Sequence, residues 1–311
     1  MQQGITVSQL ERALAAREKL AVESAAGRST DARVDSISGA TMPQESFRVA
    51  AQSRFEAAKY LNAGGGQVSR SVFMVEEPFL IWATWTPHLT PHRNILEDSS
   101  TEPGNSWAKI IVDADGSDDQ GVDLLDSLTF YYVWENATTY TTVVDVSTFM
   151  TVSGAWQAEA DFYLRHRDPG DPDGGTAVPG SAHLELSANL ALYLWWNDPP
   201  TLAPLLNAPD QQTQISLVNV DLHAGPEPVE QSGFVFNWFE LNQSLLVIPP
   251  DGVLVAEVSF DVDHGATAGR VLADFFNGDG NQITSHWLQV AYVVGPPLTG
   301  TPVVFPGPAR T

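Results

Sequence analysis

Two patterns of apolar and polar positions divide the chain near residue 66. Before this point, apolar residues recur every three or four positions, a spacing typical of helices. After it, short segments rich in Val, Thr, Tyr, Phe and Trp alternate with Gly, Pro, Asn and Asp, which is typical of strands and turns. No long helical pattern separates these segments, and this argues against a doubly wound parallel sheet. We therefore expect a mainly β fold of two tandem antiparallel sandwiches, jelly-roll-like, preceded by two N-terminal helices.

The first 66 residues predict an arm of two helices. The segment 6–26 places Leu10 and Leu14 on one face, and its Ala, Leu, Glu, Arg and Lys residues are good helix formers. The segment 44–62 has a similar apolar stripe, and the glycines at 64–66 follow it as a hinge. Neither helix is apolar enough to stand alone, so each is expected to pack on the β body or on another copy.

The β region predicts many strands joined by turns. The expected strands are 71–85, 107–113, 127–135, 138–152, 155–166, 182–196, 213–222, 232–247, 252–262, 270–276 and 284–294. In the segment 253–262, mostly polar residues alternate with apolar ones, which is typical of a strand with one face toward solvent.

A segment rich in Pro, Gly and Asp at 168–180 divides the β region into two parts. Each part begins with a Trp-bearing strand that leads into Pro, and this faint parallel favours two sandwiches of similar topology. The predicted organisation is a helical arm with linker and hinge, a first sandwich, a linker, a second sandwich and an extended Pro-rich tail, at 1–66, 67–167, 168–180, 181–295 and 296–311.

The charge of the chain is strongly acidic and unevenly distributed. The formal net charge is −23, although 43% of the residues are hydrophobic, as in a chain with a sizeable core. Residues 1–70 carry nine basic and seven acidic residues, whereas residues 71–311 carry six basic and 31 acidic ones. Such a surface repels phosphate backbones, so no nucleic-acid partner is expected. Solubility is the simplest interpretation of the charge, and cation binding or a basic partner is the alternative.

Several classes of protein are excluded by what the sequence lacks. It has no Cys, so disulfides, thiolate metal sites and a cysteine nucleophile are excluded. No window approaches 18 consecutive apolar residues, so no membrane span is expected. The N-terminus has neither a basic nor an apolar signal region. We therefore expect synthesis in the cytoplasm without a signal peptide, and leave the final location open.

Two short stretches resemble known sequences. They are Trp134-Glu135-Asn136 followed by 143–146, and the stretch from Trp195 to Thr201. Both are similar to segments of uncharacterised bacterial β-sandwich proteins, and the resemblance extends over about 75–295. It implies a β-sandwich fold and carries no activity or catalytic residues.

Two Asp- and Asn-rich loops are candidate metal sites. Carboxylate and amide oxygens at alternate positions of a Gly-containing loop can serve as calcium ligands. The candidate ligands are Asp113, Asp115, Asp118, Asn277, Asp279 and Asn281. Neither loop completes the twelve-residue calcium-loop pattern, and the same residue types are common in turns without a metal. A Ca²⁺ cofactor is therefore one interpretation, and two ordinary turns are the other.

Nine Trp residues raise the alternatives of a packed core and a platform for sugars. Trp195 and Trp196 are adjacent, so in a strand they point to opposite faces. The candidate ligand-binding group is Trp195, Trp196, Asn197 and Asp198, with Trp196 as the best exposed candidate.

The sequence carries no recognisable catalytic motif. It has neither the Gly-x-Ser-x-Gly elbow nor a phosphate-binding loop. We therefore expect a non-enzymatic structural or assembly protein, a homo-oligomeric subunit of a larger particle, fibre or shell with acidic sandwiches facing solvent. The alternative is a glycan-binding β-sandwich that uses exposed Trp and calcium, and a hydrolase with a non-local site is a third class.

Overall fold

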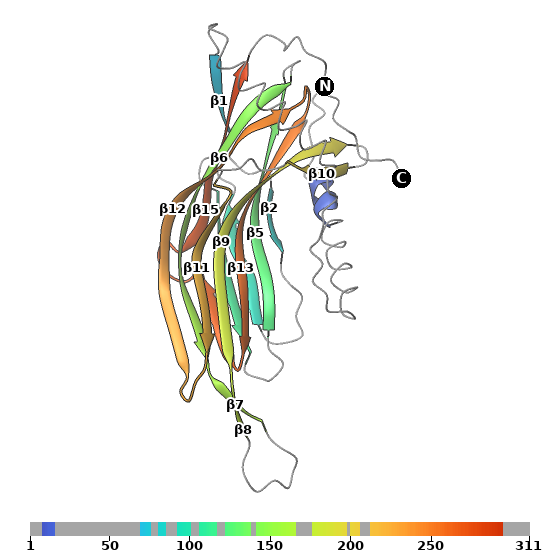
Figure 1. Cartoon of the computed structure of the whole chain (residues 1–311). Helices are drawn as coiled ribbons and strands as arrows, with labels where there is room; N and C mark the ends of the chain where they lie inside the picture. Colours follow the sequence, from blue (N-terminus) through green and yellow to red (C-terminus); the bar gives the residue numbers. More distant parts are fainter. Residues whose placement is uncertain are drawn as a thin grey trace.

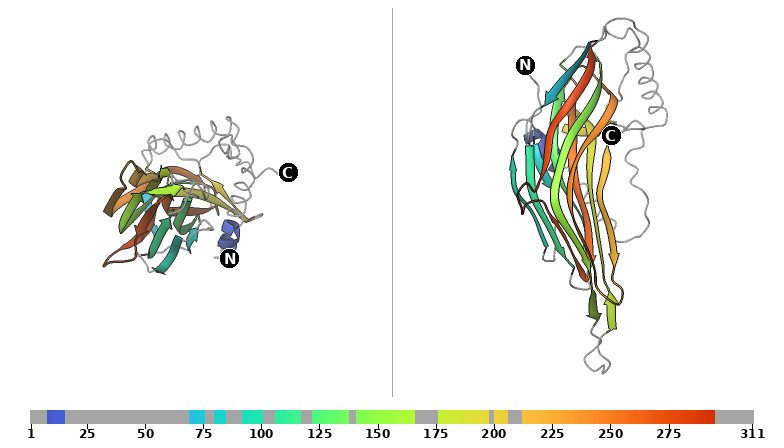
Figure 2. Two further views of the ribbon diagram at one scale, coloured as in Figure 1. Left: turned by 90° about the horizontal axis from the view of Figure 1, so that it is seen from below. Right: turned by 90° about the vertical axis from the view of Figure 1, so that its left-hand side faces the viewer.

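The chain folds into two antiparallel sheets that pack face to face as one elongated sandwich (Figures 1 and 2). The computed structural model describes residues 8–15, 69–75, 80–84, 92–100, 106–116, 122–137, 141–165, 176–197, 200–205 and 212–294. Within these ranges almost every residue of the body lies in a strand. The mainly β, sandwich-like fold expected from the sequence is therefore confirmed.

The first sheet, sheet A, has seven strands within the described ranges. In spatial order they are β1 (Ser69–Val75), β15 (Gln282–Val294), β4 (Ser106–Asp115), β14 (Gly269–Asp274), β6 (Thr142–Ala160) and β12 (Val229–Ile248), with β3 (His92–Ser100) paired to β4. Both β14 and β15 pair with β4 and with β6, so they follow one another along the same channel between those strands. The strand β12 forms one edge of the sheet.

The second sheet, sheet B, has six strands within the same ranges. In spatial order they are β10 (Pro200–Pro204), β9 (Ser181–Asn197), β13 (Val253–Thr267), β5 (Val122–Glu135) and β2 (Leu80–Thr84), with β11 (Gln214–His223) paired to β9. A separate hairpin of β7 (Phe162–Arg165) and β8 (Thr176–Pro179) extends from the lower end of the sandwich (Figure 1).

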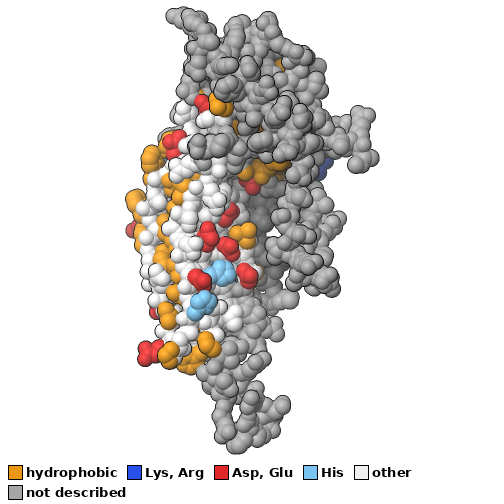
Figure 3. All heavy atoms as spheres, viewed as in Figure 1, with side chains coloured by type: hydrophobic (Ala, Val, Ile, Leu, Met, Phe, Trp, Pro, Cys, Tyr) orange, Lys and Arg blue, Asp and Glu red, His pale blue; other side chains and the backbone are white. Residues whose placement is uncertain are grey.

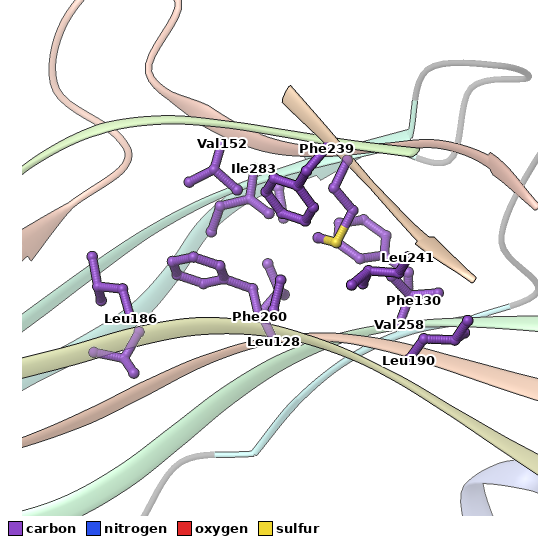
Figure 4. Packing of buried hydrophobic residues seen from close by; sticks show 14 of the residues in the cluster. Leu128, Phe130, Val152, Leu186, Leu190, Phe239, Leu241, Val258, Phe260 and Ile283 are labelled. Carbon is purple, nitrogen blue, oxygen red and sulfur yellow. The ribbon is translucent and has the colours of Figure 1, made fainter. Parts of the chain in front are cut away.

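The core lies between the two sheets and is continuous along the sandwich. Alternate residues of each long strand face inward, because successive side chains of a strand point to opposite faces. Figure 4 shows Val152, Ile283 and Phe239 of sheet A against Phe260 and Leu186 of sheet B. The burial of these side chains is the main source of stability expected for a body of this kind.

The structure does not confirm two tandem sandwiches. Strands from both predicted halves of the chain share both sheets: β12 pairs with β6 in sheet A, and β13 lies between β5 and β9 in sheet B. The predicted linker at 168–180 instead falls within the β7–β8 connection and β8 itself. The period of two identifies each strand but does not identify its partner. The sharing of both sheets by the two halves of the chain could therefore not be predicted from the local sequence pattern.

A short N-terminal helix, at residues 8–15, covers part of the outer face of sheet B (Figure 2). Its Leu10 and Leu14 are buried in a second apolar cluster with Tyr131, Trp195 and Val255. This part of the first predicted helix is confirmed, and it packs on its own sandwich. The rest of that helix, the predicted helix at 44–62, the hinge and the tail at 296–311 lie outside the described residues.

No helix within the described ranges is long and apolar enough to cross a membrane.

Candidate functional site

Within the described residues, a row of exposed aromatic side chains lies on β12. Phe234, Phe236 and Trp238 occupy alternate positions of β12 and are 60%, 75% and 61% exposed. We call these three residues the aromatic stripe. Figure 3 shows hydrophobic side chains along the left edge of the molecule, where β12 runs in the same view. Large apolar groups exposed in a contiguous row are characteristic of a binding surface.

A side chain of the neighbouring strand β6 holds the Trp238 ring in its orientation. The ring of Phe149 on β6 stacks against the Trp238 ring, with centroids 5.2 Å apart and an interplanar angle of 20°. Stacked aromatic pairs of this kind are worth about 0.5–1.5 kcal/mol beyond their buried area. One face of the indole is therefore held against Phe149, while much of its surface stays open to solvent.

The backbone beneath the stripe is also shaped by an aromatic residue. Gly233 lies directly opposite Trp156 in the β12–β6 pair, and a Cβ added at Gly233 would lie 2.9 Å from atoms of the Trp156 indole. Trp156 packs toward the core, on the other face from the stripe. The glycine thus lets a large inward ring fit next to the edge strand.

Polar side chains lie beside the stripe on the same outer face. Thr151 of β6 is directly opposite Trp238, and Ser153 is directly opposite Phe236. Thr151 Oγ1 lies 2.7 Å from Nε2 of His286 on β15. Burial lowers the pKa of His286, so its imidazole is uncharged at neutral pH. The aromatic stripe is therefore bordered by neutral hydrogen-bonding groups.

A second aromatic group lies at the other side of this face. Lys109 Nζ lies 5.7 Å from the ring centroid of Trp107 and 5.9 Å from that of Phe276, within the range of cation–π contacts. Trp107 is directly opposite Thr284 on β15, and Thr284 is directly opposite Thr151. A line of facing residues therefore runs from Trp107 across β15 and β6 to the stripe.

The predicted ligand-binding group is only partly described. Trp195 is 4% exposed and packs beneath the N-terminal helix, so its indole offers no open face to a ligand. The side chains of Trp196 and Asn197, and the whole of Asp198, lie outside the described residues. The role predicted for these three stays a prediction.

The residues of the aromatic stripe were not selected from the sequence. Their signal was the spacing of aromatic residues at 234, 236 and 238, which in a strand places all three on one face. The segment also contains Phe239, which is buried, so the count of aromatics alone did not separate the exposed residues from the core.

The first predicted metal loop carries an ion pair. The Asp113 carboxylate accepts two hydrogen bonds from the Arg270 guanidinium, from Nε and Nη2, each at 2.8 Å. This hydrogen bonding raises the pKa of Arg270. Asp115 is exposed on the same strand, and Asp118 lies outside the described residues. A metal at this loop would compete with the guanidinium for Asp113.

The second predicted metal loop forms hydrogen bonds within itself. The Asp274 carboxylate accepts hydrogen bonds from the backbone N–H groups of Phe276 and Asn277 and from the Asn277 side chain, at 2.7–2.9 Å. The Asn281 amide donates to the backbone carbonyl of Asn277. Asp279 is exposed, and the flanking glycines have positive φ angles of 112° and 82°. The contacts are those of a turn stabilised by Asp and Asn, and calcium binding at these residues stays a prediction.

A partly buried carboxylate lies on the outer face of sheet B. Asp261 accepts hydrogen bonds from Ser127 Oγ at 2.5 Å, from Ser259 Oγ at 3.2 Å and from the Asn189 amide. Burial raises its pKa, Glu257 adds to the increase, and the three donors oppose it. The group is therefore protonated at a higher pH in the folded chain than in the unfolded one.

This difference predicts that mild acid stabilises the fold through Asp261. A carboxyl group with a raised pKa binds protons preferentially in the folded state. Its contribution is fully present below the ordinary value of 3.8 and is lost as the pH rises through the folded pKa. We expect Asp261 to increase the free energy of unfolding, measured by urea titration, as the pH is lowered from neutral toward 3.8, and this increase to be absent in Asp261→Asn. The exposed Asp279→Asn variant is the control, and an unchanged pH dependence in Asp261→Asn would contradict the assignment.

Comparisons with known proteins do not assign the chain to a family. No family model and no curated protein sequence matches the chain. Among solved structures, the chain is similar to the enzymatically active domain of tailspike protein 4 of bacteriophage CBA120, with 11% identity and a TM-score of 0.17 over 72% of this chain and 19% of that one. It is also similar to a carbohydrate-binding module of the β-sandwich superfamily, with 10% identity and a TM-score of 0.13 over 69% of this chain and 58% of that one. The chain therefore spans less than two thirds of either matched chain, and at these scores neither likeness carries an argument about function.

Proposed function

We propose that the protein is a non-enzymatic glycan-binding protein and that the aromatic stripe with its polar border is the binding face. The observation that carries the proposal is the exposure of Phe234, Phe236 and Trp238 in one row on the outer face of sheet A. This replaces Trp196 by Trp238 as the exposed indole on which the hypothesis depends.

The chemistry of the face fits a sugar chain. The C–H groups on one side of a pyranose ring are electropositive, and the face of an aromatic ring carries the negative part of its quadrupole. Hydroxyl groups at the edge of the sugar require neutral donors and acceptors, and Thr151 and His286 supply them next to Trp238. A surface with rings alone would favour a purely apolar partner.

The length and charge of the face limit the class of glycan that can bind there. Residues two apart in a strand are separated by about 6.8 Å, so the stripe from Phe234 to Trp238 spans about 14 Å, which is more than one sugar ring needs. Glu230 is exposed on the same strand and the whole chain carries a net charge of −23, so polyanionic glycans are repelled. The proposed ligand is a neutral oligosaccharide or polysaccharide.

The experiment that tests this function is a glycan array probed with the full-length chain, with neutral and anionic glycans printed together. We expect binding to one or more neutral glycans and none to sulfated or uronic-acid polymers. A signal at background level for every neutral glycan would contradict the proposal.

Self-association is the second candidate function, and the edge of sheet A favours it. The strand β12 has 20 residues, and within the described part of the chain only β6 pairs with its segment 229–239. An open edge presents unpaired N–H and C=O groups on which a second chain can add a strand. On this proposal the chain is a subunit of a larger particle, fibre or shell, and β12 of one copy pairs with an edge of the next.

Introduction of a lysine into the edge strand β12 distinguishes self-association from glycan binding. Charged side chains, above all Lys, blunt strand edges against pairing. Asn237 is exposed on β12 and is not part of the stripe. If β12 mediates assembly, light scattering on a gel-filtration peak should show a large species for the wild type and a smaller one for Asn237→Lys, with glycan binding retained. A wild-type monomer near the chain mass of 33.7 kDa would contradict self-association.

A further inference from the structure

Three side chains with metal-binding atoms meet on the outer face of sheet B, away from the aromatic stripe. They are Asp123 of β5, His183 of β9 and Asp263 of β13, and one ligand atom of each lies within 4.8 Å of the others. Figure 3 shows histidine and acidic side chains gathered in the middle of the face that it presents. Within the described residues this is the one group of three His, Asp or Glu residues with that geometry.

The middle strand leaves room between the outer two. Gly265 of β13 is directly opposite Asp123 on one side and directly opposite His183 on the other. Directly opposite residues on paired strands share a face. Because Gly265 has no side chain, the imidazole and the carboxylate can approach one another over the central backbone. Asp263, two residues before Gly265 on the same strand, points to the same face.

The distances within the group fit coordination better than hydrogen bonding. His183 Nε2 lies 3.5 Å from Asp263 Oδ1 and 3.7 Å from Asp123 Oδ1, beyond the usual range of an N–H···O hydrogen bond. Zinc binds nitrogen at about 2.0–2.1 Å and carboxylate oxygen at about 2.0–2.2 Å in a tetrahedron, which separates two ligand atoms by about 3.4 Å. The observed separations are close to that value.

The local charge also favours a cation. Glu185 is directly opposite Asp263, and Asp221 is directly opposite His183, so two more carboxylates border the group. Within the described part of the chain, neither Asp123 nor Asp263 forms an ion pair with Lys or Arg. A divalent cation would offset the repulsion between the carboxylates.

We propose that Asp123, His183 and Asp263 form a site for a divalent transition-metal ion, with water at the remaining position. The imidazole ligand favours zinc and its neighbours over Ca²⁺, which prefers six to eight oxygen ligands. The site is independent of glycan binding, and it links β5, β13 and β9 at one end of sheet B.

The test is isothermal titration of the full-length chain with ZnCl₂, together with thermal unfolding in the presence and absence of ZnCl₂. We expect one zinc ion per chain and a higher Tm with zinc, because a ligand that binds the folded state stabilises it. His183→Ala and Asp263→Asn should each weaken zinc binding by more than about tenfold. Even the mutation of a residue that only hydrogen-bonds to a metal ligand typically lowers metal affinity by about 10–100-fold. CaCl₂ should bind at least about tenfold more weakly than ZnCl₂.

A nearby His–Asp pair supplies the matched control. His223 Nε2 lies 3.4 Å from Asp221 Oδ1 on β11, and both side chains are exposed. His223→Ala should leave zinc affinity within about twofold of the wild type, because that residue is outside the group. If His183→Ala is poorly folded, Asp123→Asn replaces it, since the Asp123 side chain is 89% exposed. The proposal is overturned if zinc does not bind, if His223→Ala rather than His183→Ala removes binding, or if Ca²⁺ binds as tightly as zinc.

Discussion

Replacement of Trp238 by alanine is expected to weaken glycan binding by more than about tenfold. Trp is enriched among the few residues that dominate a binding surface, whose truncation costs about 2 kcal/mol or more, and about 1.4 kcal/mol corresponds to tenfold in affinity. The variant removes the Trp238 indole, and the Phe149 ring that stacks on the indole is then exposed. The measurement is the dissociation constant, by isothermal titration, for a neutral glycan selected on the array.

The matched control for Trp238→Ala is Leu125→Ala. Leu125 is 56% exposed on sheet B, so this variant also removes an exposed apolar side chain, but from the other sheet. We expect Leu125→Ala to bind the glycan like the wild type. Equal losses in the two variants, or no loss in Trp238→Ala, would show that the stripe is not the binding face.

Replacement of Asp126 by alanine is expected to destabilise the fold by about 1–3 kcal/mol. Asp126 and His264 face each other in the core, both fully buried, with Asp126 Oδ2 and His264 Nε2 2.9 Å apart. Among the described residues, Nδ1 of His264 has no hydrogen-bond partner. Removal of the carboxylate would therefore leave the imidazole with neither ring nitrogen satisfied in an apolar environment, which is costly. The measurement is the free energy of unfolding by urea titration.

Two further variants test whether the destabilisation in Asp126→Ala comes from the loss of the His264 contact or from the loss of any carboxylate. Asp123→Ala removes an exposed carboxylate three residues earlier on the same strand, and its effect should stay within about 0.5 kcal/mol in the absence of added metal. The double variant Asp126→Ala with His264→Ala should be less destabilised than the sum of the single variants, because neither partner is then left unpaired. A loss of less than about 1 kcal/mol in Asp126→Ala would contradict the importance of the pair.

The strands could be predicted from the sequence better than their boundaries and partners. The alternation at 253–262 corresponds to β13, where Val258, Phe260 and Val262 face the core. The predicted strands 138–152 and 155–166 are largely one strand, β6, which continues through Gly154. A Cβ at Gly154 would lie 2.3 Å from the Phe275 ring, so the glycine there reflects a close approach and not a turn.

Elements that depend on distant partners were missed. The strand β3, His92–Ser100, pairs with β4 but is not among the strands expected from the sequence. The edge of β4 supplies its hydrogen-bonding partner, and local composition does not reveal such a distant partner. The helix 8–15 was predicted from its apolar spacing, but its contact with Trp195 depends on tertiary packing that periodicity does not encode.

The candidate sites differ in how far the sequence could reveal them. The aromatic stripe lies within five consecutive residues, so the period of two was sufficient to find it once 229–248 was recognised as a strand. The metal-binding group combines Asp123, His183 and Asp263, which are at least 60 residues apart and are brought together by strand register. A change of one residue in register would place each on the opposite face, so no spacing rule along the sequence could have identified them.

Hydroxyl-radical footprinting of the full-length chain, with and without the neutral glycan selected on the array, tests directly whether the aromatic stripe is the binding face. We expect the glycan to protect Phe234, Phe236 and Trp238 from oxidation and to leave the oxidation of Leu125, on the other sheet, unchanged. Protection of Leu125 with no protection of the stripe would contradict the claim that the outer face of sheet A binds the glycan.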